Sequence, residues 1–336
     1  MSTATLLAEP LDVGGIALPN RVFLAPMSGI TDAPFRERAL AHGAGLVVSE
    51  MIASGELARG RAGSTARLRR SSNAAHSVQL AGREASAMAE AARIAAGEGA
   101  DIIDINMGCP AKKVTGGYCG SALMRDPEQA LRLIDAVVGA VTVPVTLKMR
   151  LGWDQDTLNA PFIARRAEVA GVRMITIHGR TREQFYKGRA DWRAIARVKQ
   201  AVTVPVVANG DVESLADASA ILDQSGADAI MIGRAHYGAP WSAGRMVAAL
   251  RGDADPIPTR DSLLEYVRSH HEDMLSFYGR ESGLRQARKH LGWYLDRHAP
   301  GVPKPLRQAI LTATEPGQVG ELLGRAFLDE PLKACA

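Results

Sequence analysis

Short apolar, β-branched runs recur along the first 232 positions, and stretches rich in Ala, Arg and Glu with helical spacing separate them. Runs of this kind predict buried strands, and the stretches between them predict helices. The starts of these runs lie 23 to 43 residues apart, which leaves room for helices such as Ala85–Gly97, Pro127–Val138 and Pro161–Ala170. We expect eight strands, at Val22–Ala25, Leu46–Val48, Ser77–Leu80, Ile102–Ile105, Val145–Lys148, Met174–Ile177, Val206–Ala208 and Ala229–Ile232.

Regular alternation of strands and helices implies parallel strands joined by crossover helices. Eight such units within roughly 230 residues match a (β/α)8 TIM barrel, whereas a doubly wound sheet more often stops at five or six strands. The predicted fold class is therefore α/β, with a TIM barrel as its main part.

The pattern changes after residue 250. Two prolines and a glycine within 251–260 predict a linker, and no strand pattern follows it. Further on, apolar residues recur at steps of three and four, which predicts a helix that buries one face, at Leu284, Ala287, Leu291 and Tyr294. We therefore predict a barrel domain over 1–250, a linker over 251–260 and a small all-helical C-terminal domain over 261–336.

The composition is that of a globular protein: the 336 residues are 46% hydrophobic and 23% charged, which excludes a disordered or fibrous chain. No apolar stretch reaches the ~20 residues of a membrane span, and the first ten residues carry no export signal. Three cysteines, an odd number, argue against a disulfide framework. The net charge of +4 permits an anionic partner. We expect a cytoplasmic protein that is a monomer or a weak oligomer.

Polar residues close most of the predicted strands. In a TIM barrel the active site forms at the C-terminal ends of the strands, so these side chains would converge on one mouth. A single such residue would be an ordinary strand cap, but a full ring predicts a binding site. The ring consists of Pro26, Met27, Ser28, Gln79, Asn106, Lys148, Arg150, His178, Arg180, Asn209, Gly210, Asp211, Gly233 and Arg234.

Two features of this ring favour a bound phosphate and a ring cofactor. The loops after the seventh and eighth strands contain Gly210 and Gly233, and such loops commonly bind phosphate in barrels, although glycines there also serve as plain turn residues. Lys148 lies in an apolar strand, where a cation needs a partner. Because no G-x-G-x-x-G run follows a strand, FMN suits the mouth better than a Rossmann-type nicotinamide site.

Cys109 is the strongest candidate for a catalytic residue. It lies just past the fourth strand, between Gly108 and Pro110, and its thiol is positioned to donate a proton at the mouth. The alternative is a small buried hydrophobic residue, which is common for a free cysteine and suits Cys119. Cys335, next to the chain end, is the least suited to chemistry. The nine residues between Cys109 and Cys119, with no His pair nearby, disfavour a metal site.

Basic residues cluster in three segments, 59–70, 180–193 and 280–307. Each would be a solvated face if taken alone, but together they would form a track for a phosphate backbone. Trp293 and Tyr294 would either stack on bases or pack in the core of the helical domain.

The motifs together resemble those of the tRNA-dihydrouridine synthase family, and most of all its bacterial dihydrouridine synthase B branch. The resemblance covers nearly the whole chain, and its most specific part is Asn106-Met107-Gly108-Cys109-Pro110 with the Lys148 and His178-Gly179-Arg180 motifs downstream. The other segments that carry it are Ala25–Asp32, Leu147–Trp153, Asn209–Asp211, Gly233-Arg234 and Arg288–Tyr294.

The resemblance implies an FMN-containing barrel followed by a helical tRNA-binding domain. NADPH would reduce FMN, which would transfer hydride to C6 of a tRNA uridine while Cys109 protonates C5, giving 5,6-dihydrouridine. The residues implied to bind FMN are Pro26, Met27, Ser28, Gln79, Lys148, His178, Asn209, Gly210, Asp211, Gly233 and Arg234. Those expected to contact the uridine or the tRNA are Asn106, Arg150, Arg180, Arg182, Arg285, Arg288 and Lys289.

Two other functions remain open from the sequence. One is an FMN-dependent oxidoreductase of free pyrimidines, similar to a dihydroorotate dehydrogenase, which would have no use for the basic helical domain. The other is a tRNA-binding flavoprotein without catalysis, for which Cys109 would be dispensable.

Overall fold

The protein is built around a closed parallel barrel. A computed structural model describes residues 3–70 and 72–328, so Cys335 and the remainder of the predicted C-terminal domain, 329–336, lie outside the described residues. The barrel strands are β3 (Val22–Leu24), β4 (Leu46–Val48), β6 (His76–Ala81), β7 (Ile102–Met107), β8 (Val145–Arg150), β9 (Met174–His178), β10 (Val206–Asn209) and β11 (Ala229–Ile232). Each pairs with its neighbours in parallel, and β4 pairs with both β3 and β6, which closes the barrel. The predicted TIM-barrel fold is confirmed.

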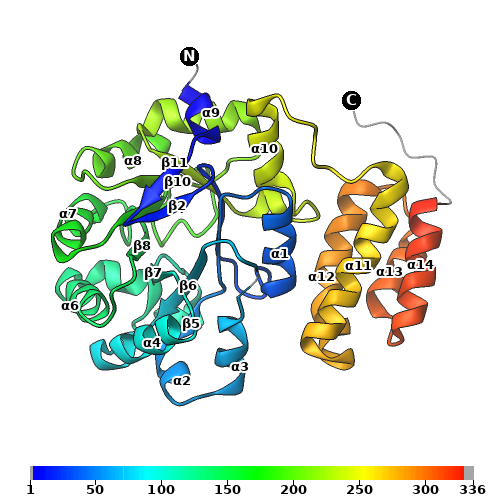
Figure 1. Ribbon diagram of the computed structural model, residues 1–336, viewed down its shortest axis with the longest axis horizontal. Helices are drawn as coiled ribbons and strands as arrows, with labels where there is room; N and C mark the ends of the chain where they lie inside the picture. Colours follow the sequence, from blue (N-terminus) through cyan, green and yellow to red (C-terminus); the bar gives the residue numbers. More distant parts are fainter. Residues whose placement is uncertain (1–2, 71, 329–336) are drawn as a thin grey trace.

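Helices follow the strands and surround the barrel (Figure 1). Local signals begin some of them: Asp126 accepts a hydrogen bond from the Gln129 N–H at 3.0 Å, directly before Pro127 at the start of α6. The helices predicted over Ala85–Gly97 and Pro127–Val138 are confirmed, and the third begins one residue earlier than predicted. The helices of the barrel part are α1 (Ala33–Ala41), α2 (Ser54–Ala58), α3 (Ala62–Thr65), α4 (Ala85–Gly97), α5 (Lys112–Thr115), α6 (Pro127–Val138), α7 (Ala160–Ala170), α8 (Trp192–Lys199), α9 (Leu215–Ser225) and α10 (Ser242–Arg251).

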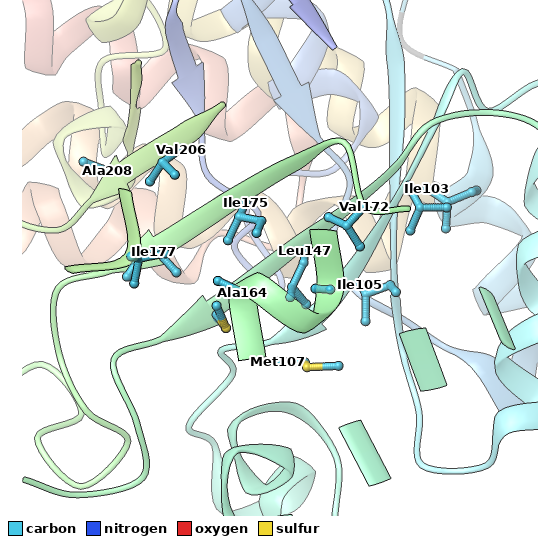
Figure 2. Packing of buried hydrophobic residues seen from close by; sticks show 14 of the residues in the cluster. Ile103, Ile105, Met107, Leu147, Ala164, Val172, Ile175, Ile177, Val206 and Ala208 are labelled. Carbon is cyan, nitrogen blue, oxygen red and sulfur yellow. The ribbon is translucent and has the colours of Figure 1, made fainter. Parts of the chain in front are cut away.

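Two hydrophobic layers hold the barrel together. Figure 2 shows the outer layer, in which strand residues such as Ile105, Leu147 and Ile177 pack with helix residues such as Ala164. The alternate strand residues, such as Phe23, belong to a second cluster that includes one residue or more from most of the strands. Because parallel strands are covered on both faces, their sequences read as nearly continuous apolar runs.

A small antiparallel hairpin precedes the barrel and was not predicted from the sequence. Its strands are β1 (Leu11–Val13) and β2 (Ile16–Leu18), joined through Gly14 and Gly15, whose φ angles are +61° and +92°. Leu11, Val13 and Leu18 are buried in the second cluster with barrel residues, so the hairpin covers apolar surface of the barrel. The Gly-Gly pair between the short triplets Leu11–Val13 and Ile16–Leu18 is the signal that could have revealed it. The two-residue β5 (Ile52–Ala53) was also not predicted.

After α10 the chain is helical. Residues 252–259 form neither helix nor strand, and four helices follow that stand together beside the barrel (Figure 1): α11 (Arg260–Tyr278), α12 (Arg280–His298), α13 (Lys304–Thr312) and α14 (Pro316–Leu328). The predicted apolar face of α12 is buried in a separate hydrophobic cluster, which also takes in Trp241 from the end of the barrel. The division into two domains at 251–260 stays a prediction. Within the described part of the chain, no helix is both long and apolar enough to span a membrane.

Candidate active site

A cavity of about 580 Å³ opens at the C-terminal ends of the barrel strands. This volume lies within the ~300–1,000 Å³ typical of small-molecule sites. Fourteen residues that the sequence predicts for the site line it: Pro26, Met27, Ser28, Gln79, Asn106, Cys109, Lys148, Arg150, His178, Asn209, Gly210, Asp211, Gly233 and Arg234. The structure therefore brings together residues separated by up to 208 positions in the sequence, because each lies in the C-terminal half of a barrel strand or in the loop after one.

A chain of side-chain hydrogen bonds joins two neighbouring strands, β6 and β7, at the wall of the cavity. The Gln79 Nε2 group donates to Asp104 Oδ2 at 2.7 Å, and Gln79 Oε1 accepts from Asn106 Nδ2 at 2.7 Å. Asn106 Oδ1 then accepts from the backbone N–H groups of Gly108 at 3.2 Å and Cys109 at 3.0 Å. Each donor meets an acceptor, so the chain sets the orientation of both amides and ends on the backbone of Cys109.

The loop that carries Cys109 is held from its other side as well. The Cys109 carbonyl accepts from the Ser121 N–H at 3.1 Å and from Ser121 Oγ at 2.9 Å. The Gly108 carbonyl accepts from Arg150 Nε at 2.8 Å. Cys119 lies nearby in sequence, but its thiol donates to the Gly117 carbonyl and does not line the cavity. The two cysteines therefore differ: one thiol belongs to the cavity wall and the other to a local turn.

Lys148 is a buried cation at the cavity. Its side chain is 9% exposed, and Nζ donates to Asn209 Oδ1 at 3.0 Å, its one acceptor among the described residues. Burial lowers the pKa of Lys148 to about 8, and the nearby Arg150 cation contributes to the decrease. An ammonium with three donors and one acceptor leaves donors free for a ligand in the cavity.

The surroundings of the mouth are positively charged. His178 lines the cavity, and burial followed by the Arg150 and Lys148 cations lowers its pKa well below the usual value, so the ring is neutral at pH 7. Two carboxylates, Asp211 and Glu213, line the same cavity. Burial opposes the ionisation of Asp211, but hydrogen bonds from Arg180 and the backbone outweigh burial and lower the pKa of Asp211. Cations exceed anions at the mouth, which favours an anionic ligand.

Arg150 and Arg180 were predicted to contact the uridine or the tRNA, and the structure gives both of them supporting roles in the loops. Each is 1% exposed. Arg150 donates to three backbone carbonyls on two loops, that of Gly108 after β7 and those of Thr181 and Phe185 after β9. Arg180 donates to the carbonyls of Lys187 and Gly188 and forms a bidentate ion pair with Asp211 at 2.9 and 2.6 Å. These donors hold the loops of the mouth, and Arg150 also lines the cavity. Contacts of the two arginines with the uridine or the tRNA stay a prediction.

Asn106 lines the cavity, whereas the four other predicted contacts, Arg182, Arg285, Arg288 and Lys289, do not. Arg182 packs over the rings of Trp153 and Phe185, with Cζ 4.6 and 4.7 Å from their centres. On α12, Arg285 is exposed. Lys289 is partly buried, and its Nζ donates to the carbonyl and to the side chain of Gln286. Arg288 is also partly buried, and its Nε has no hydrogen-bond partner. Of the three predicted contacts on α12, only Arg285 is exposed.

Sequence reasoning missed the aromatic side chains at the mouth. Tyr186 lines the cavity yet is 53% exposed, and the guanidinium groups of Arg150 and Arg234 lie 5.6 and 5.3 Å from its ring centre. Tyr237 also lines the cavity and stacks on Trp293 of α12, with ring centres 3.9 Å apart. Both tyrosines lie in loops after strands, where aromatic residues beside arginines are the one available signal.

The cavity fits a phosphate-bearing ring cofactor such as a flavin. Its volume, the free donors of Lys148 and the surplus of cations suit a phosphate and a polar ring edge. Gly210 has no room for a side chain, because a Cβ atom there would lie 2.8 Å from Ala190 Cβ and 3.0 Å from His178 Cδ2. Its φ of +126° also disfavours other residues, so only backbone lines the cavity at this position. Within the described ranges, no group of three or more His, Cys, Asp or Glu side chains is arranged to hold a metal ion.

The fold and the mouth define a TIM-barrel protein with a cation-rich cavity at the C-terminal ends of its strands, and comparisons with known proteins identify the family. The family model described as dihydrouridine synthase matches residues 23–331. The chain belongs to the dihydrouridine synthase family, as its motifs predicted.

The chain is 58% identical over 312 residues, 93% of this chain and 96% of that protein, to a probable tRNA-dihydrouridine synthase of Rhizobium leguminosarum bv. phaseoli. It is 47% identical over 288 residues to the tRNA-dihydrouridine synthase B of Pseudomonas aeruginosa, which covers 84% of this chain and 86% of that one. Among solved structures, morphinone reductase shares the fold, with a TM-score of 0.54 and 16% identity over 76% of this chain and 92% of the reductase.

Proposed function

We propose that the protein reduces a uridine of tRNA to 5,6-dihydrouridine, with FMN as its bound cofactor and NADPH as the electron donor. Membership of the dihydrouridine synthase family and the names of the two relatives support the reaction and the tRNA substrate. The observation that carries the proposal is the placement of Cys109, whose loop is held on the wall of a cation-rich barrel cavity.

The cofactor would occupy this cavity, held by Pro26, Met27, Ser28, Gln79, Lys148, His178, Asn209, Gly210, Asp211, Gly233 and Arg234. A reduced flavin bound there supplies the hydride that C6 of uracil gains. Lys148 and the Gly210 backbone provide positive charge and close approach, which suit an anionic cofactor.

Cys109 supplies the other half of the reduction. Its thiol donates the proton that C5 gains, so the C5–C6 double bond takes up one hydride and one proton. Asn106 keeps the backbone of this loop in place through its two accepted hydrogen bonds. The His178 ring, whose pKa is lowered well below its usual value, is neutral at pH 7 and has no imidazolium proton to donate.

The tRNA would lie across the mouth and the helical region, which we propose as the tRNA-binding domain over 261–336. A base within a folded tRNA loop must leave its stack to reach the cavity. Exposed arginines in the loop over 59–70 and at Arg285 supply positive charge for the phosphate backbone.

The test is mass spectrometry of unmodified tRNA after incubation with the purified flavin-loaded protein and NADPH. Cys109→Ala should lose nearly all dihydrouridine formation, and Cys119→Ala, a matched control whose thiol is outside the cavity, should retain it. Absence of product with the native protein, together with activity on free uracil or dihydroorotate, would refute the tRNA reaction. Equal product from both variants would refute the role of Cys109.

A further inference from the structure

Helix α1 of the barrel and helix α11 of the helical region are in contact, and polar side chains join them along a seam. At one end of α1, His42 Nε2 and the Tyr266 hydroxyl are 3.0 Å apart. In the middle, Arg38 forms an ion pair with Asp273 at 2.5 Å. At the other end, the Tyr278 hydroxyl donates to Asp32 Oδ2 at 3.0 Å. Two tyrosines of α11 therefore bind the two ends of α1, and only the second end faces the mouth of the barrel.

Asp32 connects this seam to the wall of the cavity. It is 2% exposed and caps α1, since its Oδ1 accepts from the Phe35 N–H at 3.0 Å. It directly follows the segment 26–31, in which Met27, Ser28 and Ile30 line the cavity. Burial raises the pKa of Asp32 to about 6, and the hydrogen bonds from Phe35 N–H and Tyr278 oppose the increase, so the hydroxyl stabilises a carboxylate that burial disfavours.

The segment 26–31 is otherwise held by bonds from the barrel side. Thr31 Oγ1 accepts from the Met27 N–H at 3.0 Å, and Glu50 accepts from the Gly29 N–H at 2.5 Å. Arg36 donates to the Thr31 carbonyl at 2.8 Å. Among the described residues, the Tyr278–Asp32 bond is the one hydrogen bond from the helical region to Asp32, and Asp32 lies next to Thr31, which takes part in two of these other bonds.

We infer that Tyr278 is a positioning residue for the cavity: through Asp32 it transmits the docking of the helical region to the cofactor-facing segment 26–31. The helical region then has a second role besides holding RNA, because its seating on the barrel sets the shape of one cavity wall. The inference rests on the proposed function only because it assumes that the ligand in contact with segment 26–31 is a flavin.

The test compares Tyr278→Phe with Tyr266→Phe in the full chain. Each change removes one hydroxyl of α11 that is bonded to one end of α1, so a general loosening of the seam would affect both equally. The first readout is hydrogen exchange of the backbone amides over 27–31. The second is the dissociation constant for FMN. It is measured by the change in fluorescence when FMN is added back to protein from which the flavin has been removed. A third variant, Asp32→Asn, retains an oxygen for the Phe35 N–H and an amide able to donate to Tyr278.

Loss of a hydrogen bond to a buried carboxylate should speed exchange over 27–31 by about tenfold and weaken FMN binding by about the same factor in Tyr278→Phe. Tyr266→Phe should leave both values unchanged, and Asp32→Asn should remain close to the native protein. Equal changes in the two tyrosine variants, or none in Tyr278→Phe, would overturn the inference. A native protein that binds no FMN would contradict the proposed function, while the exchange experiment would still decide the coupling.

Discussion

The substitution Asn106→Ala tests how the cavity holds its proton donor. Asn106 is 7% exposed and makes three hydrogen bonds, to Gln79 Oε1 and from the N–H groups of Gly108 and Cys109. At about 1 kcal/mol net for each bond, the free energy of unfolding should fall by about 3 kcal/mol. A displacement of the thiol by an ångström would lower the rate of the reduction by about 10²-fold.

The control is Asn106→Asp, which keeps an oxygen for Gly108 and Cys109 but replaces the group that donates to Gln79. It loses one hydrogen bond and also buries a carboxylate oxygen against Gln79 Oε1, and the two costs together should lower the free energy of unfolding by a similar amount while the rate falls much less. The assay is single-turnover formation of dihydrouridine with the flavin fully bound, paired with denaturant unfolding. If the Ala and Asp variants lose stability equally and also lose equal rate, Asn106 acts through stability alone and the positioning argument is refuted.

Three further predictions concern the cofactor and the RNA. Gly210→Ala should lower the free energy of unfolding by roughly 2–3 kcal/mol and reduce the amount of bound flavin, because the φ of this residue is +126° and a Cβ atom there would lie 2.8 Å from Ala190 Cβ. An unchanged melting temperature and unchanged flavin absorbance would contradict this prediction. Flavin affinity should be highest below the pKa of Lys148, about 8, and fall as the pH rises through that value and the ammonium becomes neutral. Fluorescence titrations should show this fall in affinity. If the same fall persists in Lys148→Met, Lys148 is not the group that causes it. Arg285→Gln should reduce by about one the slope of the logarithm of the tRNA binding constant against the logarithm of the salt concentration. Lys289→Gln, at a partly buried side chain, should leave this slope unchanged. Equal slopes in the two variants would contradict this prediction.

Much of the barrel could be predicted because the burial of parallel strands on both faces leaves apolar runs in the sequence. The prediction was weakest at the strand ends: β8 continues to Arg150, two residues past the predicted end, because polar side chains at the mouth still lie on the strand. The hairpin of β1 and β2 was missed because strands of three residues leave almost no periodic signal.

The sequence predicts those residues of the site that lie at the ends of the barrel strands. Cys109 and Lys148 reach the cavity because each lies on or directly after a strand. Arg150 and Arg180 show the limit, since a positive charge in the sequence does not reveal whether its partner is a phosphate or a backbone carbonyl. Tyr278 and Asp32 are 246 positions apart, so their contact depends on how the helical region docks, which no local pattern encodes.

The central claim is that Cys109 gives its proton to C5 of a tRNA uridine. Its most direct measurement is the reduction of unmodified tRNA with NADPH in heavy water, followed by mass spectrometry and position mapping of the nucleosides. The account predicts one deuterium at C5 of each dihydrouridine formed, with formation nearly abolished in Cys109→Ala and retained in Cys119→Ala. Labelled dihydrouridine formed at the native rate by Cys109→Ala, or none formed by the flavin-loaded native protein, would contradict it.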